Sequence, residues 1–258
     1  MKHPSLLNSH RLLPVILALP LALQTMLPMP MPMPMPCIAR NMDVDMEIGR
    51  ARQNAQYGHF ESVVFNLTRS IKTASGSEKA KLLTARATLR FDHEQYKDAL
   101  VDLNEAIELA PTMARAYFKK ADVLCELNQL QPAIAAIGQY IKLEPTTTSG
   151  RYFRGKLYSL SHQLDQAAAD FSYCIKYGNA EVAPSHHYLG KVLVEQKKYP
   201  EAIKEFTLGL KAGNTPHIHA TLLDRSRAYD LIGKHDLAER DRKVLNSSST
   251  DMYAEMMK

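Results

Sequence analysis

An internal repeat with a period of 34 to 36 residues constrains this chain more than any other feature. Ala99, Ala133 and Ala167 lie 34 residues apart in similar local patterns, and the frame continues through Ala202 and Ala238 with spacings of 35 and 36 residues. A fixed period in this range is typical of stacked solenoids, in which each unit contacts only its neighbours. Such arrays generally present surfaces and seldom perform catalysis, so the repeat favours a binding protein.

Residues 80–113 show what one unit contains. Apolar residues recur at helical spacing over residues 81–91 and 95–109, which predicts two helices joined by a short turn. Ala99 in the second helix is small because two helices that cross closely leave no room for a larger side chain. Pro111 ends the second helix and separates it from the next unit.

The positions within the unit carry a resemblance to a known family. Counted from the start of a unit, the eighth position is small and the eleventh is large and apolar. The seventeenth position is Tyr, the twentieth is Ala, the twenty-fourth is aromatic or aliphatic, and the thirty-second is Pro. Residues at these positions include Gly155 and Gly190, Tyr158, Tyr96 and Tyr199, Phe171 and Phe206, and Pro111 and Pro145. The chain therefore resembles tetratricopeptide repeat (TPR) proteins over residues 44–246, most closely in its four middle units. The resemblance implies an all-α fold, a right-handed superhelical solenoid of antiparallel helix pairs.

The chain also departs from the family pattern in several places. No Trp opens any unit, and Asn179 and Asn214 replace the terminal proline. Arg242 occupies an apolar position in the last unit, which suits a polar end cap. We expect a signal-like segment and Pro/Met-rich linker at residues 1–41, a solenoid at 42–246 with repeats near 44–77, 80–113, 114–147, 148–181, 183–216 and 219–246, and a flexible tail at 247–258.

The N-terminal segment predicts export. Lys2 and Arg11 precede an apolar stretch at residues 12–23, which has the length of a secretory signal core and is too short for an ordinary membrane span. The alternating Pro and Met residues at 28–36 block both helix and sheet hydrogen bonding. We expect a periplasmic or secreted protein. The alternatives are a membrane anchor formed by the uncleaved segment and a cytoplasmic protein that starts at Met42.

Charge and cysteine content bear on partners and on cross-links. Of the net charge of +5, residues 1–39 contribute +2, and residues 40–258 hold 30 basic and 27 acidic side chains. Because the charges of residues 40–258 nearly cancel, this part of the chain lacks the strongly basic surface of a nucleic-acid-binding protein. Cys125 and Cys174 fall in different repeats at positions that do not face each other, and Cys37 precedes the array. We therefore expect helix packing, and not a disulfide, to hold the fold together.

The concave face is the predicted binding surface. The family resemblance implies that the second, fifth, sixth and ninth positions of each first helix point into the groove. Aromatic rings alternate with cations there, which suits an extended or helical peptide with apolar anchors and acidic flanks. The alternative is that the rings pack between helices and the lysines are merely solvated. Lys156 and Lys191, one repeat apart, are the expected anion contacts. The predicted partner-binding residues are Arg115, Phe118, Lys119, Tyr152, Phe153, Lys156, His187, Tyr188, Lys191 and Arg227.

The best-known specific site of the TPR family, a clamp for the C-terminal carboxylate of heat-shock chaperones, is not predicted. That clamp needs Lys and Asn on one first helix, Asn on the next, and Lys and Arg on the third. The last two positions fit and the first three do not; the five residues are Ile48, Arg52, Ala85, Arg115 and Lys119.

The sequence predicts neither an enzyme nor a cofactor. It contains no Gly-rich phosphate loop, no nucleophile elbow and no His-Glu metalloprotease motif. His186, His187, His217 and His219 stand near the starts of neighbouring first helices, where imidazoles could meet around a transition metal. No carboxylate or thiol is placed to complete such a site, so we predict solvent-exposed histidines and no metal. The predicted function is a protein interaction scaffold in envelope or secretory-compartment assembly. The alternatives are a self-assembling array and a metal- or ligand-binding carrier.

Overall fold

A computed structural model describes residues 46, 48–51, 53, 54, 59–178, 180–212 and 217–246. The predicted signal-like segment, the Pro/Met run, Cys37 and the tail at residues 247–258 lie outside these described residues, as do Asn179 and Asn214.

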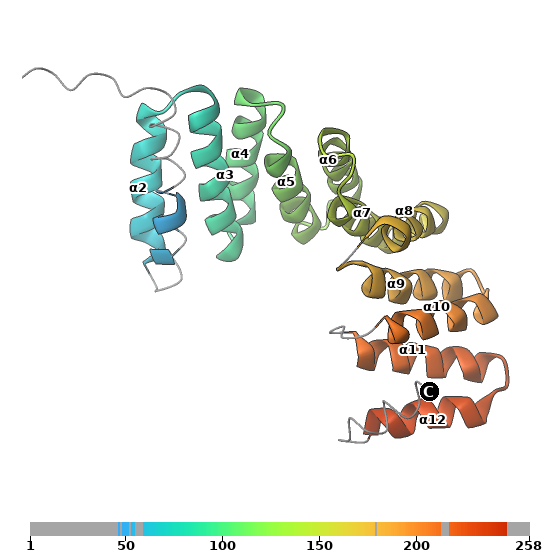
Figure 1. Cartoon of the computed structure of the whole chain (residues 1–258). Helices are drawn as coiled ribbons and strands as arrows, with labels where there is room; N and C mark the ends of the chain where they lie inside the picture. The colour runs from blue at the N-terminus through green and yellow to red at the C-terminus, as the bar shows by residue number, and fades with distance from the viewer. Residues whose placement is uncertain are drawn as a thin grey trace, which may run out of the picture.

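The described chain is an array of helices in which each helix packs against the next one along the chain. Helical residues between 46 and 54 precede the first full helix, and no strand occurs among the described residues. Figure 1 shows the helices in chain order along an arch that bends between α5 and α9. The predicted all-α solenoid of helix pairs is confirmed. The helices are α2 (Phe60–Thr73), α3 (Gly76–Asp92), α4 (Tyr96–Leu109), α5 (Ala114–Glu126), α6 (Leu130–Leu143), α7 (Thr148–Leu160), α8 (Leu164–Tyr177), α9 (Val182–Glu195), α10 (Tyr199–Lys211), α11 (Ile218–Leu231) and α12 (His235–Asn246).

The turn inside each helix pair uses one residue with a left-handed backbone. The residue after it donates its N–H to a carbonyl five positions earlier, as Gln95 does to Arg90 and Lys198 does to Leu193, both at 2.8 Å. This bond is the one that ends a helix in a Schellman motif. The φ angles lie between 55° and 73°, and only one of the five residues is glycine; they are Glu94, Asn128, His162, Lys197 and Gly233.

The repeating alanine marks the closest approach of the two helices in each pair. The side chains at this position are completely buried, at 0% exposure, in Ala99, Ala133, Ala167, Ala202 and Ala238. Burial of a small residue at every crossing is the reason for the repeat that the sequence shows.

The eighth and twenty-fourth positions have complementary sizes. Gly155 faces Phe171, and a Cβ at Gly155 would lie 2.9 Å from the phenyl Cε1. Gly190 faces Phe206 in the same way, at 2.5 Å. Two other units place Ala at the eighth position and Leu or Ile at the twenty-fourth; the pairs are Ala87 with Leu103 and Ala121 with Ile137. Glycine therefore stands where the facing side chain is a phenyl ring, which is how the core stays close-packed.

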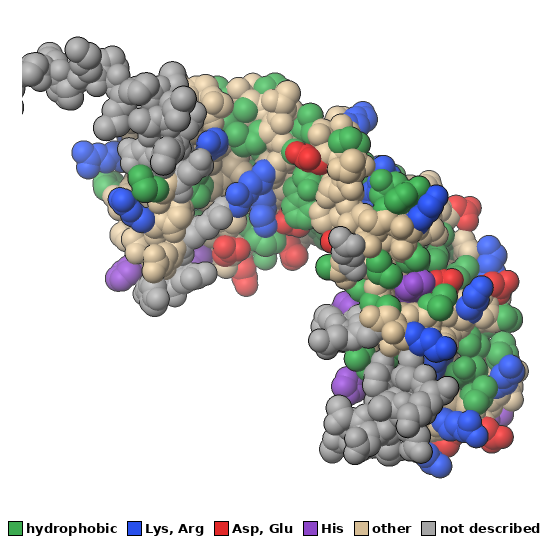
Figure 2. Space-filling view, viewed as in Figure 1, with side chains coloured by type: hydrophobic (Ala, Val, Ile, Leu, Met, Phe, Trp, Pro, Cys, Tyr) green, Lys and Arg blue, Asp and Glu red, His purple; other side chains and the backbone are tan. Residues whose placement is uncertain are grey.

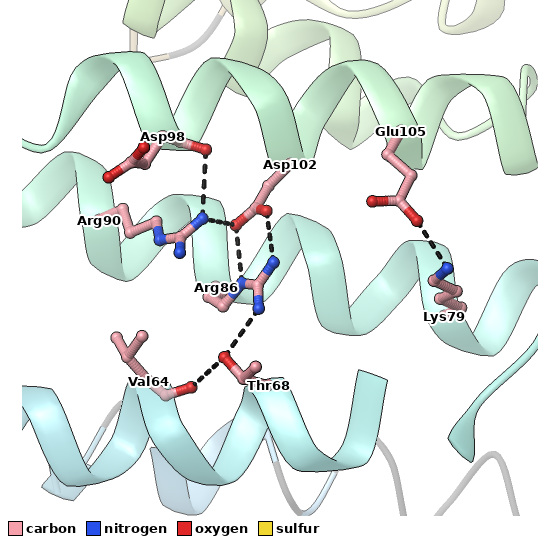
Figure 3. Close-up of polar contacts among 8 residues, drawn as sticks. All are labelled: Val64, Thr68, Lys79, Arg86, Arg90, Asp98, Asp102 and Glu105. Carbon is pink, nitrogen blue, oxygen red and sulfur yellow. Dashed lines mark hydrogen bonds and ion pairs between the residues drawn. The ribbon is translucent and has the colours of Figure 1, made fainter. Parts of the chain in front are cut away.

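Buried arginine–aspartate pairs join the helices of three pairs, and the sequence analysis did not foresee them. Arg86 of α3 donates to both carboxylate oxygens of Asp102 of α4, at 2.9 and 2.6 Å, and to the hydroxyl of Thr68 of α2 at 2.7 Å (Figure 3). Arg90 makes a third contact with Asp102, at 2.8 Å. The same bidentate pair recurs in Arg154 with Asp170 and in Arg225 with Asp241.

Every one of these pairs spans 16 residues, which places the two side chains on facing positions of the two helices. A carboxylate as deeply buried as Asp102, at 1% exposure, needs such a partner to offset its lost hydration.

Two further observations concern membrane spans and cysteines. None of the helices in the described ranges combines the length and the hydropathy that a bilayer span requires. Cys125 and Cys174 are free thiols. Burial raises the pKa of Cys174 to about 11, and its sulfur lies 3.3 Å from the carbonyl of Thr148.

Candidate functional site: the concave face

The first helices of successive pairs line the inner side of the arch. α3 contacts α5, α7 contacts α9 and α9 contacts α11, in addition to the contacts between helices adjacent in the chain. When two helices touch although one helix separates them in the chain, they lie on the inner, shorter side of a curved stack. The predicted groove residues all belong to first helices, namely α5, α7, α9 and α11.

The centre of this face is an aromatic platform formed by α7 and α9, with a phenyl ring of α8 packed against it. The ring of Tyr188 stacks on Phe171 with centroids 5.6 Å apart, and the ring of Tyr152 meets Tyr188 edge-on at 5.7 Å. Phe171 is completely buried, whereas Tyr152 and Tyr188 are half-buried. Burial, followed by the neighbouring Tyr188, raises the pKa of Tyr152 well above its usual value. The hydroxyl of Tyr152 therefore stays protonated and can donate a hydrogen bond at any physiological pH.

Two lysines lie over this platform. The Nζ atom of Lys156 is 5.9 Å from the ring centroid of Tyr152 and 5.8 Å from that of Tyr188, and Nζ of Lys191 is 5.8 Å from the Tyr188 ring. These are cation–π distances. Within the part of the chain that the structure describes, no ion pair joins either lysine to a carboxylate. The platform therefore carries two positive charges that lie over aromatic faces. The charge of Lys191 also acts on the carboxylate of Asp224, whose pKa is raised by burial and lowered by that charge.

The other predicted cations of the groove differ from these two lysines. Lys119 forms an ion pair with Asp122 at 2.9 Å and lies over the ring of Phe91 at 5.2 Å. Arg227 pairs with Asp224 at 3.3 Å. The charges of Lys119 and Arg227 are partly neutralised by these ion pairs, whereas Lys156 and Lys191 form no ion pair with a described carboxylate.

The N-terminal part of the face contains a second aromatic group. Phe118 of α5 lies between Tyr140 of α6, at 5.1 Å, and Phe153 of α7, at 5.6 Å. A shallow cavity of about 380 Å³ opens beside Phe118, with Arg115 and Lys119 in its lining. In the view of Figure 2, acidic and basic side chains are interspersed with hydrophobic ones, in agreement with the balanced charge of the repeats.

His187 does not belong to the exposed groove, contrary to the prediction. It is only 4% exposed, because α11 packs over it, and its Nδ1 lies 2.9 Å from the hydroxyl of Thr221. The ring of His187 stacks on that of His217 at 5.6 Å with an interplanar angle of 4°. Burial, with the charges of Lys191 and His217, lowers the pKa of His187 to about 4, so the ring is neutral at pH 7. The ring of His187 also meets that of Tyr188 edge-on, with centroids 5.3 Å apart.

The expectation that the neighbouring histidines are all solvent-exposed is also wrong. His186 is 9% exposed, and its Nδ1 lies 2.7 Å from a carboxylate oxygen of Glu205 on α10. Of the four, His219 is the exposed residue. No group of three His, Cys, Asp or Glu side chains suited to a metal ion occurs among the described residues.

Solved structures share this arrangement of helices. PilF of Pseudomonas aeruginosa gives a TM-score of 0.65 over 84% of this chain and 98% of its own, with 17% sequence identity. A tetratricopeptide repeat protein from Parabacteroides merdae gives 0.64 over 82% of this chain and 83% of its own, with 19% identity. This chain has the tetratricopeptide repeat fold. A third TPR structure, YrrB, which is described as having an unusual peptide-binding site, gives 0.58 over 74% of this chain and 96% of its own at 16% identity.

Curated sequences that match this chain belong to longer proteins, and the sequence matches no family model. The DnaJ protein P58IPK homolog of Arabidopsis thaliana is 28% identical over 182 residues, which cover 64% of this chain and 36% of that protein. Its homolog B in Oryza sativa is 27% identical over 170 residues, or 61% of this chain and 36% of the relative. The TPR chain therefore spans about a third of the length of the curated relatives it matches.

Some residues of the groove were not predicted from the sequence, because they lie outside the first helices or next to the ends of these helices. Tyr140 belongs to a second helix, yet its ring lines the cavity beside Phe118. A sequence signal for it exists in Gly150, where a Cβ would lie 2.6 Å from Cδ1 of Tyr140. His217 precedes α11 and packs on both His187 and Tyr188. Of the chaperone-clamp positions, Ala85 is 4% exposed and Arg52 lies outside the described residues.

Proposed function

We propose that this TPR array binds a segment of another protein along its concave face, with an acidic side chain of the partner held by Lys156 and Lys191. The observation that carries the proposal is the position of these two lysines over the Tyr152–Tyr188 platform, without an ion pair to a described carboxylate. A carboxylate between two ammonium groups on an aromatic surface gains charge-assisted hydrogen bonds in a partly desolvated site.

The aromatic rings supply the apolar part of the same contact. Half-buried tyrosine and phenylalanine rings offer large, rigid contact areas that lose little entropy on binding, which is why such residues dominate binding hot spots. Tyr152, Tyr188, Phe118 and Phe153 form two such groups along α5, α7 and α9. A partner segment with apolar anchors on either side of an acidic residue fits this arrangement. The peptide-binding site described for the TPR protein YrrB supports the same kind of use.

The test is partner capture from the native host with charge-reversed baits. The full chain is compared with Lys156→Glu/Lys191→Glu and with Lys97→Glu/Lys204→Glu, which makes the same charge change at exposed positions of the second helices α4 and α10. We expect a partner that the wild-type chain and the control variant retain and the groove variant loses. Equal capture by all three baits would contradict the proposal, and equal loss in both variants would show a non-specific charge effect.

We further propose that this binding takes place in an exported compartment, either the periplasm or the medium. The support is the sequence of residues 1–39, with Lys2 and Arg11 ahead of the apolar stretch at 12–23. N-terminal sequencing of the protein from its host tests this directly. A mature N-terminus beyond residue 23 in the extracytoplasmic fraction supports export, and a cytoplasmic chain that retains or lacks the segment contradicts it.

A further inference from the structure

The arginine–aspartate pairs of the second, fourth and sixth units define a common internal position in this fold. In each, a cation of the first helix donates to a carboxylate 16 residues later, and the carboxylate is 1% to 4% exposed. These aspartates fill the space between the two helices of a pair with a buried negative group. The three aspartates are Asp102, Asp170 and Asp241.

The third unit keeps the cation and lacks the carboxylate. Lys120 of α5 stands where the other units have arginine, and the residue 16 positions later is Ala136 of α6. Within the described ranges, no ion pair joins Lys120 to a carboxylate. Ala136 is 6% exposed, so its position is also buried, slightly less than those of the aspartates. The third unit therefore has a cation at the position of the arginines and no carboxylate at the position of the aspartates.

A cavity opens at this place. It has a volume of about 440 Å³ and is bounded by α4, α5 and α6, with both Lys120 and Ala136 in its lining. Leu100, Leu124 and Pro132 make much of its wall apolar. Tyr117, Asn104 and Gln139 also line it, and each carries a hydrogen-bond donor. On α5, Tyr117 and Lys120 lie on the helix face opposite to that of Phe118 and Lys119. The cavity is therefore separate from the concave groove.

We propose that this cavity is a second binding site, and that it takes the carboxylate of an acidic side chain of a partner protein. Charge complementarity identifies the ligand, because Lys120 offers an ammonium group where the equivalent cations of this fold bind a carboxylate. The apolar wall favours a carboxylate on a short hydrocarbon stem with apolar neighbours, as in a glutamate flanked by leucines. The ligand carboxylate then occupies the position that Asp102, Asp170 and Asp241 occupy in their own units.

Titration of the isotopically labelled chain with a short capped peptide tests this proposal. The peptide carries a central glutamate flanked by leucines, and the controls are the same peptide with glutamine and free butyrate. We expect saturable shifts of the backbone resonances of Lys120 and Ala136 with the glutamate peptide, and at least tenfold weaker binding of both controls. Equal binding of the glutamine peptide would overturn the proposed carboxylate recognition. Butyrate that binds as tightly as the glutamate peptide would overturn the proposal that the ligand is a side chain of a partner protein.

Two variants make the test specific to the cavity. Lys120→Met should weaken at least tenfold the binding of the glutamate peptide that is reported by the shifts at positions 120 and 136. Ala136→Asp should abolish it, because the new carboxylate recreates the pairing seen in Arg154 with Asp170. Circular dichroism confirms that both variants are folded, and unchanged binding by either folded variant would overturn the proposal. Lys156→Glu/Lys191→Glu should leave the shifts of Lys120 and Ala136 unchanged. The test of this cavity is therefore independent of the test of the concave groove.

Discussion

Replacing Gly190 by alanine tests the close packing of α9 against α10. The added Cβ would lie 2.5 Å from Cε1 of Phe206, whereas an ordinary carbon–carbon contact is about 3.5–4.0 Å. Phe206 is completely buried, so its ring can move away only by displacing other side chains of the close-packed core. Overpacking of this kind costs about 1–3 kcal/mol, and the better helix propensity of alanine returns about 1 kcal/mol. We therefore expect Gly190→Ala to lower the free energy of unfolding by up to about 2 kcal/mol.

Gly138 provides the matched control. It lies inside α6, and a Cβ added there would meet nothing within 4 Å. Gly138→Ala should raise the free energy of unfolding by about 0.5–1 kcal/mol, since only the propensity gain remains. Urea unfolding followed by circular dichroism measures both changes. Adding Phe206→Leu to Gly190→Ala should restore part of the loss, because Ala87 already faces Leu103 in another unit. A Gly190→Ala protein as stable as Gly138→Ala would refute this packing argument.

Two further predictions concern buried polar groups. Asp241→Ala leaves the guanidinium of Arg225, 7% exposed, without its carboxylate, and should cost about 3–5 kcal/mol in urea unfolding. Glu239→Ala, an exposed change on the same helix, should alter stability by less than about 0.5 kcal/mol, and similar losses in the two variants would contradict the role of the pair. His187 has a folded-state pKa of about 4, below its unfolded value of about 6.5, so the unfolded chain binds more protons between these pH values. The contribution of His187 to stability is therefore present above about pH 6.5 and is lost as the pH falls toward 4. A His187→Phe variant should lose less stability than wild type between these two pH values. Equal losses in both proteins would argue against a buried neutral ring.

The fold follows from the sequence because its main determinants recur in every unit. Completely buried alanines such as Ala99 and Ala133 set the helix crossings and therefore reveal the period. The pairing of Gly155 with Phe171 follows from the same frame. The left-handed turn residues could not be predicted in this way, because Glu94 and Lys197 are not glycines. Their backbone is imposed by the helices on either side.

The site was only partly predictable because position in a repeat does not determine depth. Lys156 and His187 both occupy groove positions, yet Lys156 lies over the aromatic platform and His187 is buried under α11. The difference depends on what the following unit places against each residue, here the hydroxyl of Thr221. The Arg86–Asp102 pair left a signal in its recurring spacing of 16 residues, which apolar periodicity does not detect.

Photo-crosslinking tests the central claim, that partners bind on the concave face, most directly. A photoreactive amino acid is placed at Leu223 of α11, which is 39% exposed on the groove side, or at Leu208 of the second helix α10, which is 38% exposed. Irradiation in the native host should join the partner to the chain through position 223 and not through position 208. Cross-links from position 208 alone would place the partner on the outer face and contradict the account.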